Sequence, residues 1–384
     1  MSSTGRVALM VHPSAELYGS DRMFAESVAA LAERGWRVVA ALPHDGPLAE
    51  LLREHAHVVH CPTAVLRKTA LRPAGLLRLI VDSVRATPRM LGLLKDSRPD
   101  VVYVNTLTVP QWIVMARLCR KPVLAHVHEA EDEVAAPVRV ALAAPLLAAH
   151  TVVVNSDATR RSITAALPRL ARTSRLLYNG VAGPEHAVQL RTYDPSPVGL
   201  VLVGRLSPRK GTDIAVEAVA ELLRDGHDVT LDLVGSAFTG YEWFERRIRS
   251  RVDELELTGR VSLRGFTEEV WRAYARADIA LVPSRVEPFG NTAVEAQLAG
   301  VPVVVTDTQG LPETVAHGTY GSVVPRDDPR ALADAIAAML DDWPHTRRIA
   351  ERARSAALER FAPATYRAGL AGIAADLIER DRER

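Results

Sequence analysis

The feature that most constrains the fold of this chain is an alternation of short apolar segments with helical patterns. The first series begins at Arg6 and contains RVALMV, WRVVAAL, VVHC, VVYVN and PVLAHVH. Because these segments are apolar at successive positions, we expect strands buried on both faces, as in a parallel sheet covered by helices. Such a series predicts a doubly wound α/β domain.

A turn-rich stretch at 182–197 ends the first series, and a second one follows with VGLVLVG, VTLDLVG, VSLRGF, DIALVPS and VPVVVTD. A chain of 384 residues also exceeds what one ordinary core supports. We therefore predict two Rossmann-like domains, at residues 1–184 and 185–362. Ligands bind at the carboxyl ends of strands in such sheets, so we expect the two halves to face each other across a ligand cleft.

Charge and cysteine content exclude several classes of protein. The net charge of +1 gives no global field that would attract nucleic acid, so any anion site has to be local. Cys61 and Cys119 are widely separated, as expected for core thiols in a reducing compartment. The first apolar run predicts a strand rather than a signal peptide, and no run reaches the ~20 residues of a membrane-spanning helix. We expect a cytoplasmic protein.

The loop GRLSPRKG, from Gly204 to Gly211, follows a predicted strand and opens a helix. It brings together Arg205 and Lys210, and Lys210 is the only lysine in the second half of the chain. Two cations beside the free amides of a helix start suit a diphosphate. Taken alone, the same octapeptide is also compatible with a solvated basic loop.

The stretch EPFGNTAVEAQLAG places Glu287 before a predicted helix and Glu295 one turn inside it. The backbone amides of Gly290, Asn291 and Thr292 at the helix start favour an anion. Carboxylates accept paired hydrogen bonds from neighbouring sugar hydroxyls. A sugar nucleotide would therefore meet a carboxylate, the helix amides and a second carboxylate in order. Each glutamate alone also fits a solvated side chain, and only the combination with the basic loop favours a ligand site.

Two further strand ends, VGSAFTG at 234–240 and LRGFTEE at 263–269, contain Gly235 and Phe266. A glycine at the end of a strand allows the backbone to approach a base or a phosphate closely. These two strand ends are weaker candidates for a nucleotide site than the two loops above.

Together these motifs resemble the GT-B glycosyltransferases, specifically the retaining, metal-independent family 4, or glycosyl transferases group 1. The resemblance extends over almost the whole chain, through HVHE, the NGV before the linker, GRLSPRKG and the E-x7-E pattern of EPFGNTAVE. It implies a GT-B fold of two Rossmann-like domains and a C-terminal helix at 363–384 that crosses back to the N-terminal domain. It further implies that Arg205 and Lys210 hold the donor diphosphate, Glu295 the ribose and Glu287 the hydroxyls of the donor sugar.

The complete set of site residues that the resemblance implies has three parts. The catalytic residues are His128, Glu287, Arg205 and Lys210. The donor site consists of Gly19, Gly204, Arg205, Lys210, Gly235, Phe266, Phe289, Gly290, Asn291, Thr292 and Glu295. The residues expected at the acceptor are Tyr18, Ser20, Asn105 and Glu129.

Two segments in the first half of the chain contain residues of this implied site. The segment LYGSDR (17–22) stands where the family has Gly-Gly-x-Glu, so Ser20 and Asp21 replace a glycine and a glutamate. His128 in HVHE matches the histidine near the reacting sugar, although a lone histidine on a strand is more often structural. We expect His126 to point to the side of the strand opposite His128.

The predicted activity is transfer of a hexosyl or N-acetylhexosaminyl group, with retention, from a nucleotide-diphosphate sugar to a hydroxyl of a glycan, lipid-linked or small-molecule acceptor. We expect a UDP-linked sugar as the donor, and GDP-mannose is the second candidate. No Asp-x-Asp motif occurs, so we predict no metal and no other cofactor, with Arg205, Lys210 and the helix start stabilising the leaving group. A sugar-nucleotide epimerase and a non-catalytic sensor remain alternatives. A pyridoxal-phosphate phosphorylase is excluded, because Lys210 is assigned to phosphate.

The segment 66–98 contains eight basic residues and two acidic ones, interleaved with LLRLIVDSV and MLGLLK. This pattern is compatible with peripheral contact to anionic lipid, or to a polyprenyl-phosphate acceptor, at the inner membrane face. It is also compatible with a pair of amphipathic helices that cover the sheet and keep their arginines in solvent. We favour the second interpretation.

Overall fold

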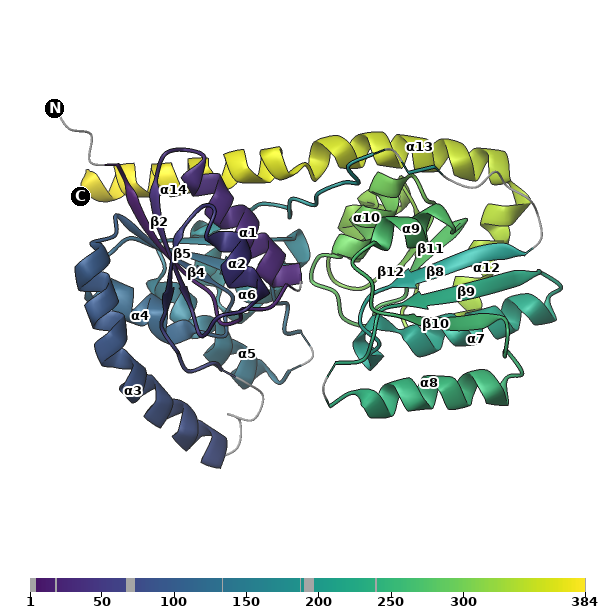
Figure 1. Ribbon diagram of the computed structural model, residues 1–384, viewed down its shortest axis with the longest axis horizontal. Helices are drawn as coiled ribbons and strands as arrows, with labels where there is room; N and C mark the ends of the chain where they lie inside the picture. Colours follow the sequence, from purple (N-terminus) through teal and green to yellow (C-terminus); the bar gives the residue numbers. More distant parts are fainter. Residues whose placement is uncertain are drawn as a thin grey trace. The chain divides into compact units, whose positions relative to one another are not determined.

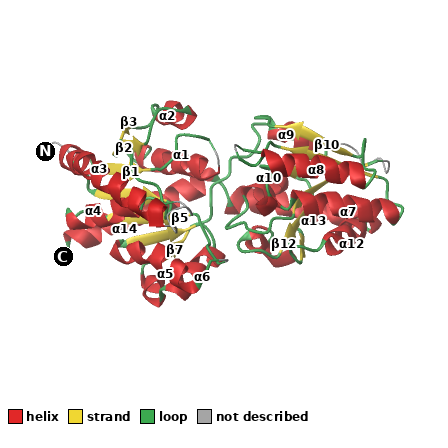
Figure 2. Cartoon of the chain, turned by 90° about the horizontal axis from the view of Figure 1, so that it is seen from below, coloured by secondary structure: helices red, strands yellow, loops and turns green. Residues whose placement is uncertain are grey.

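The structure is a computed structural model, and it describes residues 5–17, 19–66, 73–132, 134–186, 188–189, 197–238 and 240–383. The chain divides into two compact units (Figures 1 and 2). Unit 1 comprises Met1–Gly180 and Pro363–Arg384, and unit 2 comprises Val181–Ala362. The division therefore falls a few residues before the expected boundary after residue 184, and the C-terminal segment belongs to unit 1.

Unit 1 is built on a parallel sheet whose described strands lie in the order β3-β2-β1-β4-β5-β6-β7 (Figure 1). The strands are β1 (Val7–Val11), β2 (Arg37–Leu42), β3 (His57–His60), β4 (Val101–Asn105), β5 (Val123–Val127), β6 (Thr151–Val154) and β7 (Ser174–Leu176). The strand order reverses between β1 and β4, which pair from Ala8 with Val101 to Val11 with Val104. The loops that follow these two strands therefore leave the same edge of the sheet at its switch point.

Helices cover both faces of this sheet, because side chains alternate in direction along each strand. Ala8 and Met10 of β1 pack with one layer of helices, and Leu9 and Val11 pack with the other. The first layer contains α1 (Gly19–Ala32), α2 (Pro47–Leu52) and α14 (Pro363–Arg382). The second layer contains α3 (Pro73–Ser97), α4 (Pro110–Leu118), α5 (Ala136–Ala143) and α6 (Asp157–Ala166).

Helix α14 is part of the core of unit 1. Leu370 and Ile378 are buried with the residues of α1 and β1. The hydroxyl of Tyr366 lies 2.6 Å from Ser27 Oγ of α1, and the guanidinium of Arg367 donates to Glu26 at 2.7 Å. The C-terminal segment thus completes one face of the unit 1 sheet.

Unit 2 repeats this plan with described strands in the order β10-β9-β8-β11-β12-β13. The strands are β8 (Val198–Val203), β9 (Val229–Val234), β10 (Val261–Gly265), β11 (Ile279–Val282), β12 (Val303–Thr306) and β13 (Ser322–Val324). On one face lie α7 (Thr212–Arg224), α8 (Glu242–Glu254) and α12 (Pro329–Asp341). On the other lie α9 (Val270–Ala275), α10 (Asn291–Ala299) and α11 (Leu311–Thr314), with α13 (Trp343–Arg360) beside α10. The predicted pair of doubly wound α/β halves is confirmed.

Three helices differ from the sequence-based expectation. The sequence after the strand at 122–128 predicts one long helix to His150, but α5 ends at Ala143 and a 3₁₀ turn follows over Ala144–Ala148, because Pro145 has no amide to continue the ladder. The helical pair expected within 66–98 is a single helix in the described residues, with Pro88 inside it; residues 67–72 lie outside the description. Helix α13 was not predicted. Among the described residues, no helix has the length and apolarity needed to cross a membrane.

The packing of α14 predicts the effect of a cavity in its buried face. Leu370 is fully buried, so Leu370→Ala should lower the free energy of unfolding of unit 1 by about 2–5 kcal/mol. Arg380→Ala, on the exposed side of the same helix, is the control and should change it by less than ~0.5 kcal/mol. Denaturant unfolding followed by tryptophan fluorescence measures both. Equal, small effects of the two substitutions would contradict the assignment of α14 to the core of unit 1.

Candidate functional site

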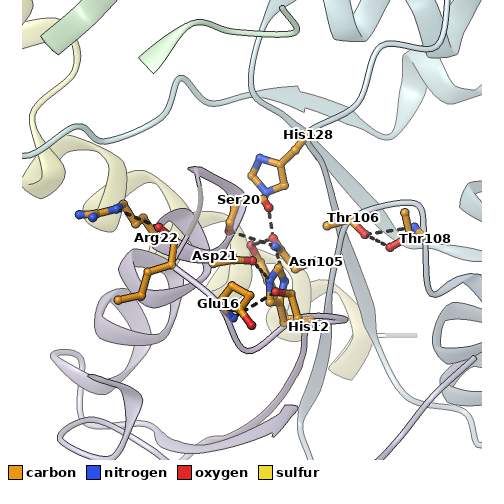
Figure 3. A network of polar contacts seen from close by, with 12 residues as sticks. His12, Glu16, Ser20, Asp21, Arg22, Asn105, Thr106, Thr108 and His128 are labelled. Carbon is orange, nitrogen blue, oxygen red and sulfur yellow. Dashed lines mark hydrogen bonds and ion pairs between the residues drawn. The ribbon is translucent and has the colours of Figure 1, made fainter. Parts of the chain in front are cut away.

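In unit 1 the polar side chains gather at the carboxyl edge of the sheet, where the strand order reverses. His12 directly follows β1, Asn105 is the last residue of β4, and His128 follows β5. Asn105 pairs with His126 in the register of β4 and β5, which places the two strand ends side by side. Figure 3 shows these side chains converging with Asp21 from the first turn of α1.

Asn105 is the centre of this network (Figure 3). Its Nδ2 donates to His12 Nδ1 at 2.9 Å and faces the backbone carbonyl of Ser20 at 3.5 Å. Its Oδ1 accepts from Tyr103 at 3.0 Å and lies 2.9 Å from His128 Nε2. Because a carbonyl can only accept, the contact with Ser20 fixes which end of the amide is the donor.

The orientation of this amide determines the tautomers around it. His12 Nδ1 accepts from Asn105, so the proton of the neutral ring is on Nε2, which donates to Asp21 Oδ1 at 2.6 Å. In the same way Asn105 Oδ1 requires a donor from His128, so Nε2 carries the proton of that ring. Nδ1 of His128 is therefore left as the acceptor of the ring.

His126 has the opposite tautomer. Tyr103 donates its hydroxyl proton to Asn105, so it accepts from His126 Nδ1 at 2.7 Å. Nε2 of His126 is then a buried acceptor with no partner among the described residues. An unpaired acceptor is tolerated more readily in a protein interior than an unpaired N–H donor, which also favours this tautomer.

The expected opposite orientation of His126 and His128 is wrong. The two residues are two positions apart, so they share a face of the strand, and their ring centroids lie 4.0 Å apart. Burial, with His12 nearby, lowers the pKa of the His128 imidazole to about 3, and burial lowers the pKa of His126 well below its usual range. Both rings are therefore neutral at physiological pH.

Glu129 lies next to His128 and contacts the loop after β4. Its Oε2 accepts from the backbone amides of His128 at 3.0 Å and Leu107 at 3.3 Å. Burial nevertheless raises the pKa of this carboxyl to about 7. Next to it, Thr106 has a φ of 77°, which is unusual for a β-branched residue, and its hydroxyl lies 2.6 Å from that of Thr108.

The remaining candidates of unit 1 lie at the start of α1. Gly19 begins the helix and is exposed, and Ser20 contributes its backbone carbonyl to Asn105. Asp21, which replaces a residue of the family pattern, is buried against His12. Tyr18 lies outside the described residues.

In unit 2 the corresponding reversal lies between β8 and β11, and the loops after these strands carry the predicted motifs. Gly204 directly follows β8 with a φ of 146°, and its backbone amide donates to the Val234 carbonyl at 2.9 Å. The guanidinium of Arg205 lies 5.4 Å from the ring centroid of Phe238, which follows β9. Gly211 has a φ of 64°, and a Cβ there would overlap the carbonyl of Pro283. The basic loop is thus held tightly against the strand end that precedes Glu287.

The structure brings Lys210 and Glu287 together as an ion pair, although they come from different loops. Both side chains are mostly buried, with 25% and 15% of their surface exposed. Ser284 Oγ donates to the same carboxylate oxygen at 3.4 Å. The backbone carbonyl of Glu287 accepts from Gly310 at 3.1 Å, so both its main chain and its side chain are fixed.

Helix α10 begins directly after this loop. Gly290, its N-cap, has a φ of 112°, and no side chain caps the helix there. Thr292 Oγ1 is buried and has no partner among the described residues. One turn further on, Glu295 Oε2 is 3.4 Å from the Tyr274 hydroxyl, which also donates to the Thr292 carbonyl at 3.1 Å. The start of α10 therefore offers backbone amides between two oriented carboxylates.

Three predicted donor residues occupy different environments. The backbone of Gly235 donates to Gly265 at 2.8 Å, and a Cβ on Gly235 would overlap the carbonyl of Gly204. Phe266, which follows β10, is 70% exposed. The Phe289 side chain is only 2% exposed and packs edge-on against Phe361.

Sequence reasoning missed four residues that orient the candidate groups: His12, Ser284, Tyr274 and the role of Asp21 as the partner of His12. His12 is the first residue after β1, a position that could have been noticed. Tyr274 lies on a helix distant in sequence from Glu295 and gave no signal. The described residues contain no group of three or more His, Cys, Asp and Glu side chains arranged to hold a metal ion.

Comparisons with known proteins match most of the chain. Residues 19–180 match the family model described as glycosyl transferase 4-like domain, and residues 191–356 match that described as glycosyl transferases group 1. A glycogen synthase of Mycobacterium tuberculosis is 32% identical over 286 residues, which cover 71% of this chain and 68% of that protein.

Two further matches extend the comparison. The lipopolysaccharide core biosynthesis mannosyltransferase LpsB of Rhizobium meliloti is 34% identical over 153 residues, 39% of this chain and 44% of that protein. The crystal structure of Anabaena Alr3699/HepE in complex with UDP-glucose superposes with a TM-score of 0.78 at 23% identity, and covers 96% of this chain and 99% of that one. The last match shows a shared fold.

The network around Asn105 predicts how its replacement affects His128. Asn105→Asp places a carboxylate against the Nε2–H of that ring, so the pKa of His128 should rise by about 1–3 units from its value of about 3. Asn105→Leu, of similar size and without charge, should leave the pKa low but remove the preference for the Nε2–H tautomer. Nitrogen-15 NMR of the histidine rings measures both quantities. An unchanged tautomer in Asn105→Leu would contradict the proposed control by the amide.

The raised pKa of Glu129 predicts a pH dependence of stability. Between its ordinary value of 4.5 and about 7, the folded chain holds a proton that the unfolded chain has lost. The free energy of unfolding should therefore fall as pH rises through this window, by on the order of 1–3 kcal/mol. Glu129→Gln, which stays neutral and keeps an acceptor oxygen, should abolish this fall. Urea unfolding at both ends of the window tests it, and an identical slope in the two proteins would assign the effect to other groups.

Proposed function

The chain belongs to the glycosyl transferases group 1 family, and we propose that it transfers a hexosyl or N-acetylhexosaminyl group, with retention and without a metal ion, from a UDP-linked donor. The acceptor in this proposal is a hydroxyl of a glycan, a lipid-linked sugar or a small molecule. The observation that carries the proposal is the arrangement in unit 2 of Lys210 paired with Glu287 before the uncapped start of α10, with Glu295 one turn inside.

Each part of this arrangement matches one part of a sugar nucleotide. Cations and helix amides bind a diphosphate, and Lys210 and Arg205 supply the cations beside α10. Glu287, fixed by Lys210 and Ser284, is suited to accept from vicinal hydroxyls of the sugar. Glu295, oriented by the Tyr274 hydroxyl, is suited to the hydroxyls of the ribose. The exposed ring of Phe266 offers an apolar surface for the base.

Two comparisons support the choice of donor. The fold neighbour with a TM-score of 0.78 was solved in complex with UDP-glucose, which favours a UDP-linked hexose. The relative named a mannosyltransferase makes GDP-mannose the second candidate. The two donors differ in base and in sugar, so direct binding measurements distinguish them.

The proposed reaction needs no protein nucleophile. The bond between the anomeric carbon and the diphosphate oxygen breaks, and a bond from the acceptor oxygen to the same face of the anomeric carbon forms. The acceptor hydroxyl gives its proton to the departing phosphate oxygen, so the products are the glycoside and the nucleoside diphosphate. Lys210, Arg205 and the amides of α10 stabilise the charge that develops on the leaving group, which is the role a metal ion has in other sites.

Unit 1 contributes neutral hydrogen-bonding groups to this proposal. His128, with the proton of its neutral ring on Nε2, presents Nδ1 as an acceptor for a sugar hydroxyl. Its low pKa argues against a role as a general acid. We assign Ser20, Asn105 and Glu129 to the acceptor side as groups that orient His128 and the loop after β4.

The two members of the ion pair in unit 2 should differ in their effect on UDP binding when each is replaced. Lys210→Met removes a charge from the diphosphate, so it should lower kcat/KM by ~100-fold and weaken UDP binding. Glu287→Gln should lower kcat to a similar extent, but it should leave UDP binding unchanged or tighter, because it frees Lys210 and UDP lacks the donor sugar that Glu287 would bind. Arg209→Met, an exposed cation in the same loop, is the matched control. Loss of UDP binding in Glu287→Gln would contradict this division of roles.

Donor identity is tested by thermal shift against UDP-, GDP-, ADP- and TDP-sugars, with and without EDTA, on the wild type and Glu295→Ala. We expect stabilisation by UDP-sugars that persists in EDTA and is lost in the variant. Stabilisation by GDP-mannose alone would make GDP-mannose the donor in place of a UDP-sugar. Loss of the stabilisation in EDTA would contradict metal independence. Release of UDP that depends on an added acceptor sugar then separates a transferase from an epimerase, which needs no acceptor, and from a sensor, which converts no substrate.

A further inference from the structure

Helix α3 has one face that packs on the sheet and a second apolar face that does not. Ala86, Met90 and Leu94 belong to the buried core of unit 1, together with residues of β1, β4 and Trp112 of α4. Within the described residues these side chains follow one another at a spacing of four, which defines the inward side of the helix. Figure 1 shows α3 on the outside of unit 1, beside α4.

The second apolar face is exposed to solvent. It consists of Leu77, Ile80, Val81, Val84 and Leu91, whose exposed fractions are 63%, 52%, 37%, 66% and 42%. The spacings of three, four and seven residues between them place all five on one stripe along the helix. Single exposed aliphatic residues are common on protein surfaces, whereas a stripe of five on one helix indicates a surface that contacts something apolar.

Basic side chains lie along one side of this stripe. Arg78, Arg85 and Arg89 are exposed and follow each other at spacings of seven and four, so they form a second row next to the apolar one. Two acidic residues, Asp82 and Asp96, occur in the helix, and Asp82 is partly neutralised by Arg78 at 3.7 Å. The net charge of the whole chain is only +1, so this local excess of positive charge is not a general property of the protein.

We propose that the exposed face of α3 binds the surface of an anionic lipid bilayer, with the apolar stripe in the acyl-chain boundary and the arginines at the phosphate headgroups. A helix with an aliphatic face beside a basic row has the composition of a peripheral membrane helix. Protein interfaces instead concentrate aromatic residues at their centre, and α3 contains none. This charge complementarity to lipid phosphate reverses our sequence-based preference for α3 as a simple cover of the sheet.

The proposal is independent of the proposed function, because it concerns the outer side of α3 and none of the candidate site residues. A soluble sugar acceptor would still be used by a chain that cannot bind lipid. Failure of one proposal therefore leaves the other in place, and the two are measured by different assays.

The test is cosedimentation of the full chain with vesicles of phosphatidylcholine, with and without phosphatidylglycerol. We expect binding to vesicles that contain phosphatidylglycerol, weakened by salt. Each arginine near an anionic surface contributes a factor of about five, so Arg85→Gln with Arg89→Gln should lower the partition coefficient by about thirty-fold. Leu77→Ser with Val84→Ser should lower it by at least about ten-fold, because the apolar insertion is lost.

Matched controls come from unit 2. Arg246→Gln with Arg247→Gln removes two exposed arginines from α8, and Leu358→Ser removes a 53% exposed leucine from α13. Neither should change vesicle binding. Thermal unfolding verifies that all variants fold, which is expected because every substituted side chain is exposed.

Three results would overturn the proposal. Equal binding to neutral and anionic vesicles would remove the role of the arginines. Absence of binding to both kinds of vesicle, at low salt, would exclude a lipid bilayer as the binding partner of this face. Concentration-dependent self-association of the wild type that Leu77→Ser with Val84→Ser abolishes, without lipid binding, would make this face an interface between copies of the chain.

Discussion

Both candidate sites depend on one constraint, the parallel pairing of the strands. In a parallel sheet all carboxyl ends lie at one edge, and at the point where the strand order reverses two neighbouring loops diverge and leave room for side chains. In unit 1 this point brings together His12 after β1 and Asn105 at the end of β4. In unit 2 it brings the basic loop after β8 to the Glu287 loop after β11, so residues about eighty positions apart form an ion pair.

The two edges have different electrostatic character. In unit 1 the hydrogen bonds of Asn105 give each ring a defined tautomer, and burial keeps His126 and His128 neutral. Such a network holds its geometry without exchanging charge. In unit 2 Lys210 and Glu287 neutralise each other, and a ligand with its own negative charge would compete for the lysine. The first edge is therefore suited to orient hydroxyl groups, and the second to respond to a diphosphate.

The sequence predicted the fold and the positions of the loops that carry the candidate residues, because strand alternation and glycines at strand ends are local signals. It did not predict α13, whose residues have no strong apolar periodicity, or the end of α5 before Pro145. It named Lys210 and Glu287 but not their pairing, since no local pattern encodes a contact between two loops. It misplaced His126 although a two-residue spacing on a strand defines a shared face. The only sequence signal for His12 is its position directly after a strand, and Tyr274, whose partners lie on α10, has none.

The loop after β4 shows how the neutral edge is maintained. Thr106 has a left-handed backbone that costs on the order of 1–3 kcal/mol, and it persists because the following amide, that of Leu107, is held by Glu129. Two amides favour the ionised carboxylate, but burial favours the protonated acid and has the larger effect on its pKa. The same burial that keeps His128 neutral raises the pKa of Glu129 to about 7, so this carboxyl is partly protonated at neutral pH. Desolvation of this edge is the common cause of both pKa shifts.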